Sequence, residues 1–311
     1  MKKFEIRKIS ELSEETLKNF YSRAFKFDTE INENYRWRYR IGYKNFEPLV
    51  LIVDNKIVGH AGLIPISIRV KEKIEDAIWF TDFYVNSNSR SLGYGQALTD
   101  AWMKICPLQI TLCNEDSLKI FKKFKWKSNS NYYRQIKPIK YLNFLSLFKK
   151  PNKNLQISPI LEKKIIDLVK KIEKNSLNKK DVEIVRNEEW FKWRLLECPY
   201  KKDILIFEYE NEYLLGHIYN KENFKRMNVL FSTKKSNSEI YKLVTLWSLK
   251  NKIDYISFVD NKNKTNKLLK LPYLTKKINF AYFSKNDLLL NKIDQNIDDI
   301  QYIDSDIDYI N

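Results

Sequence analysis

Hydrophobic and polar positions alternate at the start of the chain in patterns typical of short strands and amphipathic helices. The run KFEIRKI (3–9) alternates as a strand does, and LSEETLKNFYSRAF (12–25) has the apolar spacing of a helix, with Ser13 as its cap. Two strands follow over 48–70, joined by a tight turn at 54–56. The pattern therefore predicts a strand, a helix and a hairpin.

The next segments predict further strands, now separated by helices. EDAIWFTDFYV (75–85) reads as a strand, GYGQALTDAWMKI (93–105) as a helix and LQITLC (108–113) as a short buried strand. SLKIFKKF (117–124) is helical and NYYRQIK (131–137) is strand-like. This order predicts an α/β fold, of the α+β kind with a mixed sheet.

The second half of the chain repeats the plan of the first. In each half a Trp-Arg pair precedes a strand, a hairpin turn and a Gly-His pair, which holds one of the chain's two histidines. We interpret this as an internal duplication. It predicts two tandem domains, 1–145 and a degenerate repeat at 156–286, followed by an acidic tail at 287–311. The pairs are Trp37-Arg38 and Gly59-His60 in the first half, and Trp193-Arg194 and Gly216-His217 in the second.

Composition narrows the class of protein without choosing a ligand. With 43% hydrophobic and 14% aromatic residues, the 311-residue chain can build packed cores, which excludes disorder as its main state. The net charge of +17 is spread along the chain and favours anionic partners in general. Three cysteines without metal-like spacing indicate a reduced, cytoplasmic protein without a metal. No stretch approaches the roughly 20 apolar residues of a membrane span.

A glycine pair stands where the predicted strand 75–85 leads into the predicted helix 93–105. Gly93 and Gly95 are two of only six glycines in the chain. Without Cβ atoms, backbone N–H groups can converge there on a phosphate, assisted by the helix dipole and by Arg90. The third glycine of a dinucleotide fingerprint is missing, and no Gly-Lys-Ser/Thr of a phosphate-binding P-loop follows. A plain tight turn is the alternative interpretation.

Two segments carry a resemblance to a known family. DFYVNSNSRSLGYGQAL (82–98) and TLCNEDSLKIFKKFKW (111–126) resemble the GNAT acyltransferase superfamily. The likeness covers residues 1–138, and 156–286 as a degenerate second copy in which STKKSNSEIY replaces the glycine loop. The WRY at 37–39 and the WRL at 193–195 resemble tandem-domain acyltransferases found in bacterial surface-polysaccharide gene clusters.

The resemblance implies acyl-CoA, most simply acetyl-CoA, as the cosubstrate. The loop would bind its pyrophosphate, and the strand before the loop would pair with the pantetheine arm, with a backbone N–H near Val85 polarising the thioester carbonyl. Asn114 and Phe121 would also contact the arm. The implied cofactor residues are Phe83, Tyr84, Val85, Arg90, Ser91, Leu92, Gly93, Tyr94, Gly95, Gln96, Asn114 and Phe121.

The catalytic residues are less clearly marked than the loop. Asp82 is the first candidate for a base that deprotonates an amine, although a hydrogen-bonded aspartate at a strand end explains it equally well. Many family members have a tyrosine acid where this chain has Phe121, which cannot donate a proton. Tyr132 or Tyr133 would have to replace it, or the thiolate leaves unassisted. For the histidines, His60 included, a structural role is favoured.

Tandem members of the family imply an acceptor site near the seam between the domains. The candidate lining residues are Trp37, Arg38, Tyr39, Trp193 and Arg194. Stacking or a cation–π contact with a sugar or nucleotide is one role for the tryptophans. Core packing is the favoured one, because both precede a strand.

Together these patterns predict a cytoplasmic N-acyltransferase that acylates a primary amine of a small substrate, for example a nucleotide-linked amino sugar. A tRNA-dependent aminoacyl transferase of the cell-wall type is an alternative, but it would not need the glycine loop. A basic binding module for nucleic acid or membranes would show aromatic-studded basic patches, whereas the lysines here are dispersed. A catalytically silent member is the last alternative, because of Phe121. No nucleic acid partner, transmembrane segment or metal is expected.

Overall fold

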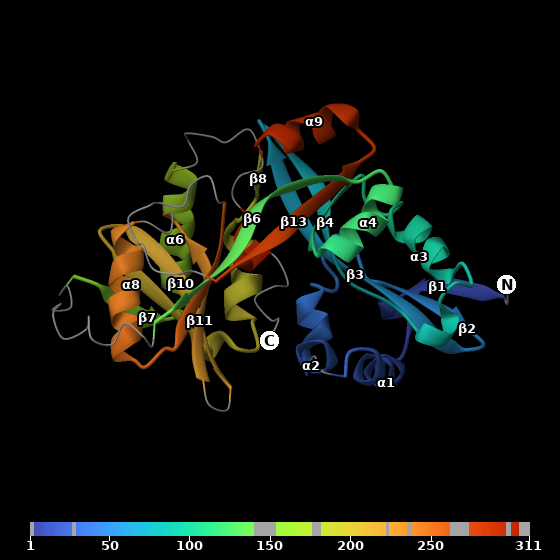
Figure 1. Cartoon of the computed structure of the whole chain (residues 1–311), viewed down its shortest axis with the longest axis horizontal. Coiled ribbons are helices and arrows are strands. Elements are labelled where there is room, and N and C mark those ends of the chain that lie inside the picture. Colours follow the sequence, from blue (N-terminus) through green and yellow to red (C-terminus); the bar gives the residue numbers. More distant parts are fainter. Residues whose placement is uncertain are drawn as a thin grey trace.

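A computed structural model describes residues 3–26, 29–139, 154–175, 182–221, 224–234, 238–261, 274–296 and 300–304. The chain forms two lobes joined by one mixed 13-stranded sheet (Figure 1). The strand order is β1-β2-β3-β4-β5-β13-β6-β12-β11-β10-β9-β7, with β8 paired to β3. The predicted α/β class with a mixed sheet is confirmed.

The N-terminal lobe follows the predicted order of elements, with one helix that the pattern did not indicate. That helix, α2, is strongly polar and is kinked at Asn34, which obscures a helical period. The elements are β1 (Phe4–Lys8), α1 (Glu14–Ala24), α2 (Thr29–Arg38), β2 (Leu49–Val53), β3 (Lys56–Val70), β4 (Lys73–Val85), α3 (Tyr94–Trp102), β5 (Leu108–Cys113), α4 (Glu115–Lys123) and β6 (Lys127–Pro138).

The C-terminal lobe has the same central order of a hairpin, a third strand, a helix and a fourth strand. The chain elements are β7 (Gln156–Pro159), α6 (Glu162–Asn175), β8 (Val182–Ile184), α7 (Glu188–Phe191), β9 (Ile204–Tyr209), β10 (Glu212–Lys221), β11 (Phe224–Ser232), α8 (Glu239–Lys250), β12 (Tyr255–Asn261), β13 (Leu274–Ser284) and α9 (Asp287–Asn296). The turn Lys192–Leu196 continues α7.

The two lobes exchange strands where they meet. β13, near the end of the chain, lies between β5 and β6 and pairs antiparallel with both. β6, from the first half, pairs in turn with β12 of the second half. The long β6 and β13 therefore run from one lobe into the other (Figure 1). The predicted domain boundary between residues 145 and 156 falls largely outside the described residues.

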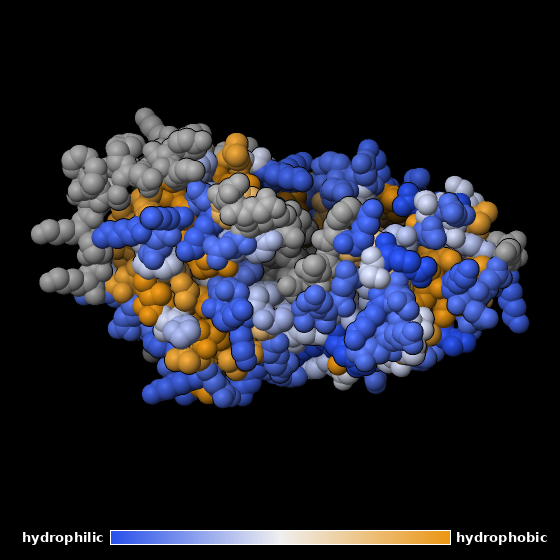
Figure 2. All heavy atoms as spheres, turned by 90° about the horizontal axis from the view of Figure 1, so that it is seen from below, coloured by the Kyte–Doolittle hydropathy of each residue, from blue (hydrophilic) through white to orange (hydrophobic). Residues whose placement is uncertain are grey.

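The helices cover the two faces of the N-terminal lobe in pairs, α1 with α2 below and α3 with α4 above (Figure 1). Helix α1 forms as its sequence predicts: the Ser13 hydroxyl accepts a hydrogen bond from the Thr16 N–H at 3.3 Å. Leu17, Phe20 and Tyr21 are its buried residues. The outer surface on this side of the lobe is largely hydrophilic (Figure 2), as expected when an amphipathic helix buries its apolar face.

Residues 300–304 of the predicted acidic tail are packed against the second lobe, whereas residues 287–296 form α9, which contacts β13, β6 and β8. Arg186 donates to Asp304 through Nε at 2.7 Å and Nη2 at 2.5 Å, and both side chains are buried. Ile300 and Ile303 belong to the large hydrophobic core. Residues 300–304 thus hold a fixed place, and residues 305–311 lie outside the described ranges. Within those ranges no helix has the length and apolarity required to cross a bilayer.

Candidate active site

The site begins where β4 and β5 part. They pair in parallel only at Ile78–Gln109 and Trp79–Ile110. Beyond this point β4 carries a bulge: opposite β3 its register shifts between His60 and Gly62. Asp82 lies within it in the left-handed region, with φ of 49°, a conformation that aspartate tolerates better than most residues. A bulge bends a strand and re-aims its side chains, so it helps to open the sheet here.

A side chain replaces the missing ladder bond at the start of this opening. The Thr111 hydroxyl, on the residue after the last paired position of β5, donates to the Phe80 carbonyl at 2.7 Å. The buried carbonyl is therefore satisfied although the strands have separated. The opening is a stable part of the fold, since it leaves this backbone group with a partner.

A cavity of about 660 Å³ occupies the opening. Its wall comes from four elements of the first lobe, β4, α3, β5 and α4, and from the two exchanged strands, β6 and β13. The aromatic part of the wall is continuous, because Phe80 stacks on Trp102 with ring centroids 4.0 Å apart and meets Phe121 edge-on at 5.7 Å. The lining residues are Phe80–Phe83, Thr99, Trp102, Thr111–Ser117, Ile120, Phe121, Phe124, Arg134 and Lys276–Asn279.

The glycine loop ends in an open helix N-terminus. Gly93 caps α3 with φ of 80°, which explains glycine at that position. The first backbone bond of α3 runs from the Ala97 N–H to the Gly93 carbonyl at 3.0 Å, so the N–H groups of residues 94–96 have no intrahelical acceptor. A Cβ on Gly95 would meet only Val85 Cγ2, at 3.7 Å. The packing of the chain itself therefore does not require Gly95.

The other predicted cofactor residues divide between surface and interior. Phe83, Asn114 and Phe121 lie on the cavity wall. Asn114 also caps α4, since its Oδ1 accepts from the Ser117 N–H at 2.9 Å. Tyr94 is buried against Phe4. Of the rest, Tyr84 packs against α1, whereas Arg90, Ser91, Leu92 and Gln96 are exposed.

Asp82 reaches the cavity with its carboxylate already held by three donors. Arg38 donates through Nε to Oδ2 and through Nη2 to Oδ1, both at 3.0 Å, and the Tyr39 hydroxyl donates to Oδ2 at 2.9 Å. The Arg38 side chain is 2% exposed and that of Asp82 is 11% exposed. A carboxylate has about four lone-pair sites. One site on Oδ1 therefore remains for another donor.

His60 supports this arrangement from beneath. Its Nδ1 lies 2.9 Å from the Asp82 carbonyl oxygen, and its ring is packed among Phe20, Tyr21 and Tyr39. Burial lowers the pKa of His60 to about 4, so the ring is neutral at physiological pH. Its placement fits the structural role that the sequence favoured.

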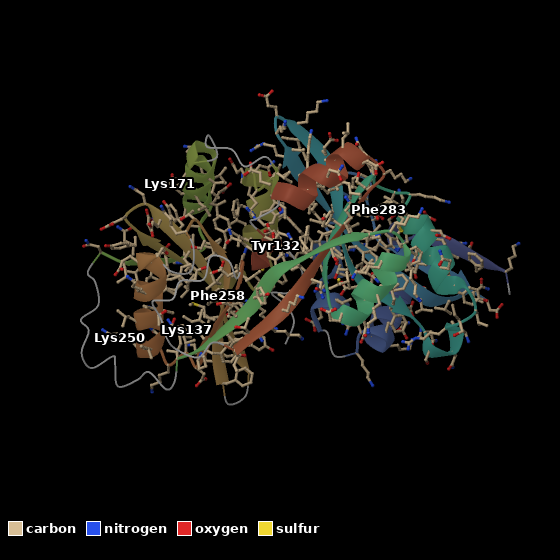
Figure 3. The ribbon with its side chains drawn as sticks, turned by 45° about the horizontal axis from the view of Figure 1, so that its top comes forward. Tyr132, Lys137, Lys171, Lys250, Phe258 and Phe283 are labelled. Atoms are coloured by element: carbon tan, nitrogen blue, oxygen red, sulfur yellow. The ribbon has the colours of Figure 1, made fainter. Side chains whose placement is uncertain are left out.

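The predicted proton donors lie away from the cavity wall. Tyr132 is buried near the centre of the molecule (Figure 3), with its ring 5.8 Å from that of Phe280. Tyr133, the next residue of β6, pairs with Asp260 and Lys277 and is also not among the lining residues. Phe121 lines the cavity and packs against Trp126 at 4.6 Å. The described wall therefore contains no tyrosine.

The two Trp-Arg elements meet at the seam between the lobes. Trp37 Nε1 donates to the Trp193 carbonyl and Trp193 Nε1 donates to the Trp37 carbonyl, each at 2.8 Å. The Arg194 guanidinium lies over both rings, at 5.5 and 5.2 Å. Arg38 and Tyr39 bind Asp82 instead. None of the five residues predicted to line the acceptor site is itself on the cavity wall.

Several wall residues were not anticipated from the sequence. Arg134 comes from β6, and residues 276–279 come from β13, which is distant in sequence from the other wall residues. Asn279 donates to Glu115 at 2.9 Å, which ties β13 to the start of α4.

The cavity wall also holds one thiol, Cys113. Burial, followed by the charge of Glu115, raises the pKa of this thiol to about 12, so it is neutral. No group of three or more His, Cys, Asp or Glu residues in the described ranges could hold a metal.

Comparison with known proteins supports a family assignment for the first lobe. Residues 9–126 match the family model described as the Acetyltransferase (GNAT) family. The resemblance suggested by the glycine loop is confirmed for this segment, which matches the model of that family. The resemblance to tandem members from polysaccharide clusters stays a prediction. No curated protein matches the chain significantly.

Solved structures extend the likeness of the fold over both lobes. A GCN5-related N-acetyltransferase from Kribbella flavida has a TM-score of 0.64 and 12% identity, covering 89% of this chain and 71% of that one. A second, from Anabaena variabilis, has a TM-score of 0.62 and 12% identity over 92% and 74%. Saccharomyces cerevisiae N-myristoyltransferase with bound myristoyl-CoA and inhibitors has 0.59 and 11% over 91% and 80%.

Proposed function

We propose that the protein is an acyl-CoA-dependent N-acyltransferase that transfers an acyl group, most simply acetyl, to a primary amine of a small acceptor. One observation carries the proposal. Where β4 parts from β5, the cavity that contains Asp82 is also lined by Thr99 and Trp102 of α3, so the helix with the open N-terminus gives one connection between the loop and the cavity. An elongated cosubstrate with a phosphate at one end and a reactive thioester at the other fits this connection.

The loop supplies the phosphate end of the proposed site. The unpaired N–H groups of residues 94–96 and the positive end of the α3 dipole favour a pyrophosphate. No acidic residue stands in the first turn of α3 to repel it. Arg90, which donates through Nε to the Val85 carbonyl at 3.1 Å, keeps its other nitrogens for a phosphate oxygen.

Asp82 supplies the acceptor end. The remaining acceptor site on its Oδ1 can hold an ammonium and take its proton, after which the neutral amine attacks the thioester carbonyl. The new C–N bond forms as the C–S bond breaks, and the departed thiolate takes up the second proton that the nitrogen loses. Arg38 and Tyr39 fix the carboxylate, so that positioning contributes to the rate. A backbone N–H near Val85 would stabilise the oxyanion.

The absence of a tyrosine from the described wall is compatible with this chemistry. A thiolate whose conjugate thiol has a pKa near 8.5 is a weak base, so it can leave without an acid and take up a proton afterwards. Tyr132 and Tyr133, the proton donors suggested by the sequence, would then be dispensable. For the acceptor we retain an amino group on a nucleotide-linked sugar as the working example, since a basic protein attracts anionic substrates.

Binding of desulfo-CoA tests the cosubstrate, with Gly95→Trp as the key variant. Because a Cβ fits at Gly95 without strain in the fold, a large side chain there should block the α3 N–H groups but leave the lobe intact. We expect calorimetry to show micromolar binding to the wild type and a loss of about 100-fold in Gly95→Trp. Gly95→Ala is the matched control and should bind nearly as well.

Two results would overturn the cosubstrate assignment. If the wild type binds neither desulfo-CoA nor acetyl-CoA, the loop is only a turn, and the tRNA-dependent and binding-module alternatives gain weight. If Gly95→Trp binds as tightly as the wild type, the cosubstrate lies elsewhere. Thermal unfolding of both variants should match that of the wild type and confirms that they are folded.

A further inference from the structure

We propose that the end of the cavity formed by the exchanged strands is an anion subsite, where Arg134 and Lys276 bind the phosphate or carboxylate group of the acceptor. This rests on the proposed acyl transfer. It narrows the acceptor to a class of bipolar molecules, primary amines that also carry an anionic group.

The first observation is a pair of like charges held opposite each other. Arg134 of β6 and Lys276 of β13 are register partners in an antiparallel ladder, and both line the cavity. Directly opposed side chains lie on one face of a sheet with Cβ atoms about 5 Å apart, and like charges there are destabilising. A bound anion would turn this repulsion into attraction, because both cations would share it.

The second observation is that these cations have no acidic partner. In the part of the chain that the structure describes, no carboxylate lies within ion-pair distance of Arg134, Lys276 or the neighbouring Lys277, which also lines the cavity. Two buried arginines elsewhere are neutralised, Arg38 by Asp82 and Arg186 by Asp304. The cations at this end of the cavity differ in facing open space.

The third observation concerns orientation. Arg134 Nε donates to the Ser257 hydroxyl at 3.3 Å, and Ser257 is fully buried in β12. This bond ties the guanidinium to the second lobe, which limits its freedom before any ligand arrives. Both Nη groups stay available, and two parallel N–H donors suit a phosphate or carboxylate. The subsite is thus built from one strand of each half and positioned by a third.

The place of these cations in the fold separates them from the cosubstrate's pyrophosphate. The α3 N-terminus follows β4, whereas Lys276 and Lys277 lie beyond the last pair of β5 with β13, Cys113–Asn279. Asp82 stands on the wall of the same cavity. An acceptor with its ammonium at Asp82 and its anion at Arg134 and Lys276 would match the charge at both ends.

Calorimetry on protein saturated with desulfo-CoA tests the subsite, because the α3 site is then occupied. The probes are O-phosphoethanolamine, β-alanine and ethanolamine, three small amines that carry a phosphate, a carboxylate and no anion. We expect at least one anionic probe to bind at least about 10-fold more tightly than ethanolamine. The double variant Arg134→Gln, Lys276→Gln should lose this preference. The control Lys104→Gln, Lys285→Gln removes two exposed charges away from the cavity and should keep it.

A stability measurement keeps the test decisive if the variant folds poorly. Inorganic phosphate should raise the thermal unfolding midpoint of the desulfo-CoA-saturated wild type but not that of the double variant. Without an anion, Lys276→Gln alone should be at least as stable as the wild type, since it removes the repulsion. Equal binding of all three probes to the wild type, or an equal loss in variant and control, would overturn the subsite.

The outcomes distinguish the subsite from the acyl-transfer proposal. If desulfo-CoA fails to bind, acyl transfer is refuted, and the probes are titrated against the free protein. An anion preference that depends on Arg134 and Lys276 would then leave a binding site without transfer. If desulfo-CoA binds and no preference appears, the subsite alone is wrong.

Discussion

The two lobes stop pairing their third and fourth strands at corresponding points, and the structure has a cavity at that point in the first lobe and buried aromatic rings in the second. In the first, β4 and β5 stop pairing after Trp79 and Ile110. In the second, β11 and β12 stop after Asn228 and Ser257. The next residue after the last pair is Thr111 on β5 in the first lobe and Phe258 on β12 in the second. A hydroxyl that bonds across the gap is thus replaced by a buried ring.

The third strand shows the same contrast. On β4 the last residue paired with β5 is Trp79, and Asp82 lies three residues after it. On β11 the last residue paired with β12 is Asn228, and Phe231 lies three residues after it. Asp82 reaches the cavity, whereas Phe231 is buried in the large core with its ring 5.6 Å from that of Phe191. Two aromatic side chains stand in the second lobe where the first has polar groups. The same backbone plan therefore gives a cavity in one lobe and packed core in the other.

The helices after the third strands differ in charge as well as in their loops. Helix α3 has no acidic residue in its first turn, whereas α8 begins with Glu239. A carboxylate at this position already complements the helix dipole, and it would repel a phosphate. The loop, the gap and the helix end all change together. These three differences leave the proposed ligand site in the first lobe without a counterpart among the described residues of the second.

The largest loss of unfolding free energy should come from removing the Asp82 carboxylate, the polar group at this position of the first lobe. Asp82→Ala leaves the buried Arg38 charge without its partner, which typically costs about 3–5 kcal/mol. Chemical denaturation should show this loss. Asp76→Ala is the control, because Asp76 pairs with Lys44 at a far more exposed site and should cost less than about 1 kcal/mol. Similar losses in both variants would show that the Asp82 pair is not special.

Removing a packed aromatic ring from the second lobe should destabilise the protein nearly as much, without changing its affinity for desulfo-CoA. Phe231→Ala removes a buried ring from the second lobe, which should lower the free energy of unfolding by about 3 to 4 kcal/mol. Affinity for desulfo-CoA, measured by calorimetry under folding conditions, should stay at the wild-type value. A parallel fall in affinity would mean that the second lobe takes part in cosubstrate binding.

At Lys137 the contrast between the lobes is reversed, because here the second lobe has the polar residue and the first the aromatic one. Lys137 of β6 pairs with Ile256 of β12 in the second lobe, and Phe283 of β13 pairs with Gln109 at the corresponding position of β5 in the first. The second lobe thus has an amine where the first has a ring; Figure 3 labels both side chains. The Lys137 Nζ is hydrogen-bonded to Thr245 at 3.1 Å, and burial lowers its pKa to about 8. Lys137→Met should therefore raise stability at pH 7 by up to about 3 kcal/mol.

This gain should depend on pH with a definite sign. Between about pH 8 and the ordinary lysine pKa of 10.5, the folded protein has lost this proton and the unfolded chain has not. Wild-type stability from this group therefore rises with pH. Urea unfolding should show the advantage of Lys137→Met falling to about 1 kcal/mol at pH 9.5. Lys250→Met, at an exposed position on α8, should show neither the gain nor its pH dependence.

The smallest effect is expected where the two lobes are most alike. Trp37→Phe removes one of the two reciprocal indole-to-carbonyl bonds and should cost about 1 kcal/mol. Trp193→Phe removes the other and should cost about the same. Desulfo-CoA affinity should be unchanged in both, as neither ring lines the cavity. A large drop in affinity in either variant would move the tryptophans into the binding site.

The elements that the sequence predicts well are those whose cause is local. The Ser13 cap, the 54–56 turn and the passage from β4 through the glycine loop to α3 all depend on neighbouring residues. The phosphate end of the candidate site follows from the same stretch. Periodicity and turn chemistry are sufficient for such features.

The rest of the site depends on contacts that a hydrophobic pattern does not specify. The pattern of β13 indicates a strand, but nothing in it names β5 as a neighbour. Arg134, Lys276 and Asn279 were therefore missed. Arg38 was noted as a possible acceptor ligand, and its bidentate bond to Asp82 emerges only from the fold. Charged residues in a basic chain do not identify their own partners.

The exchange of β6 and β13 has a consequence for how the protein is made. While the ribosome synthesises the second half, β5 has an unpaired edge, because its partner β13 ends at Ser284. At about 5–20 residues per second, that edge stays open for on the order of 10 to 30 s. Open strand edges favour pairing with other chains. The first lobe can complete its sheet only after Ser284 has been synthesised, so translation that stops before β13 leaves the edge of β5 exposed.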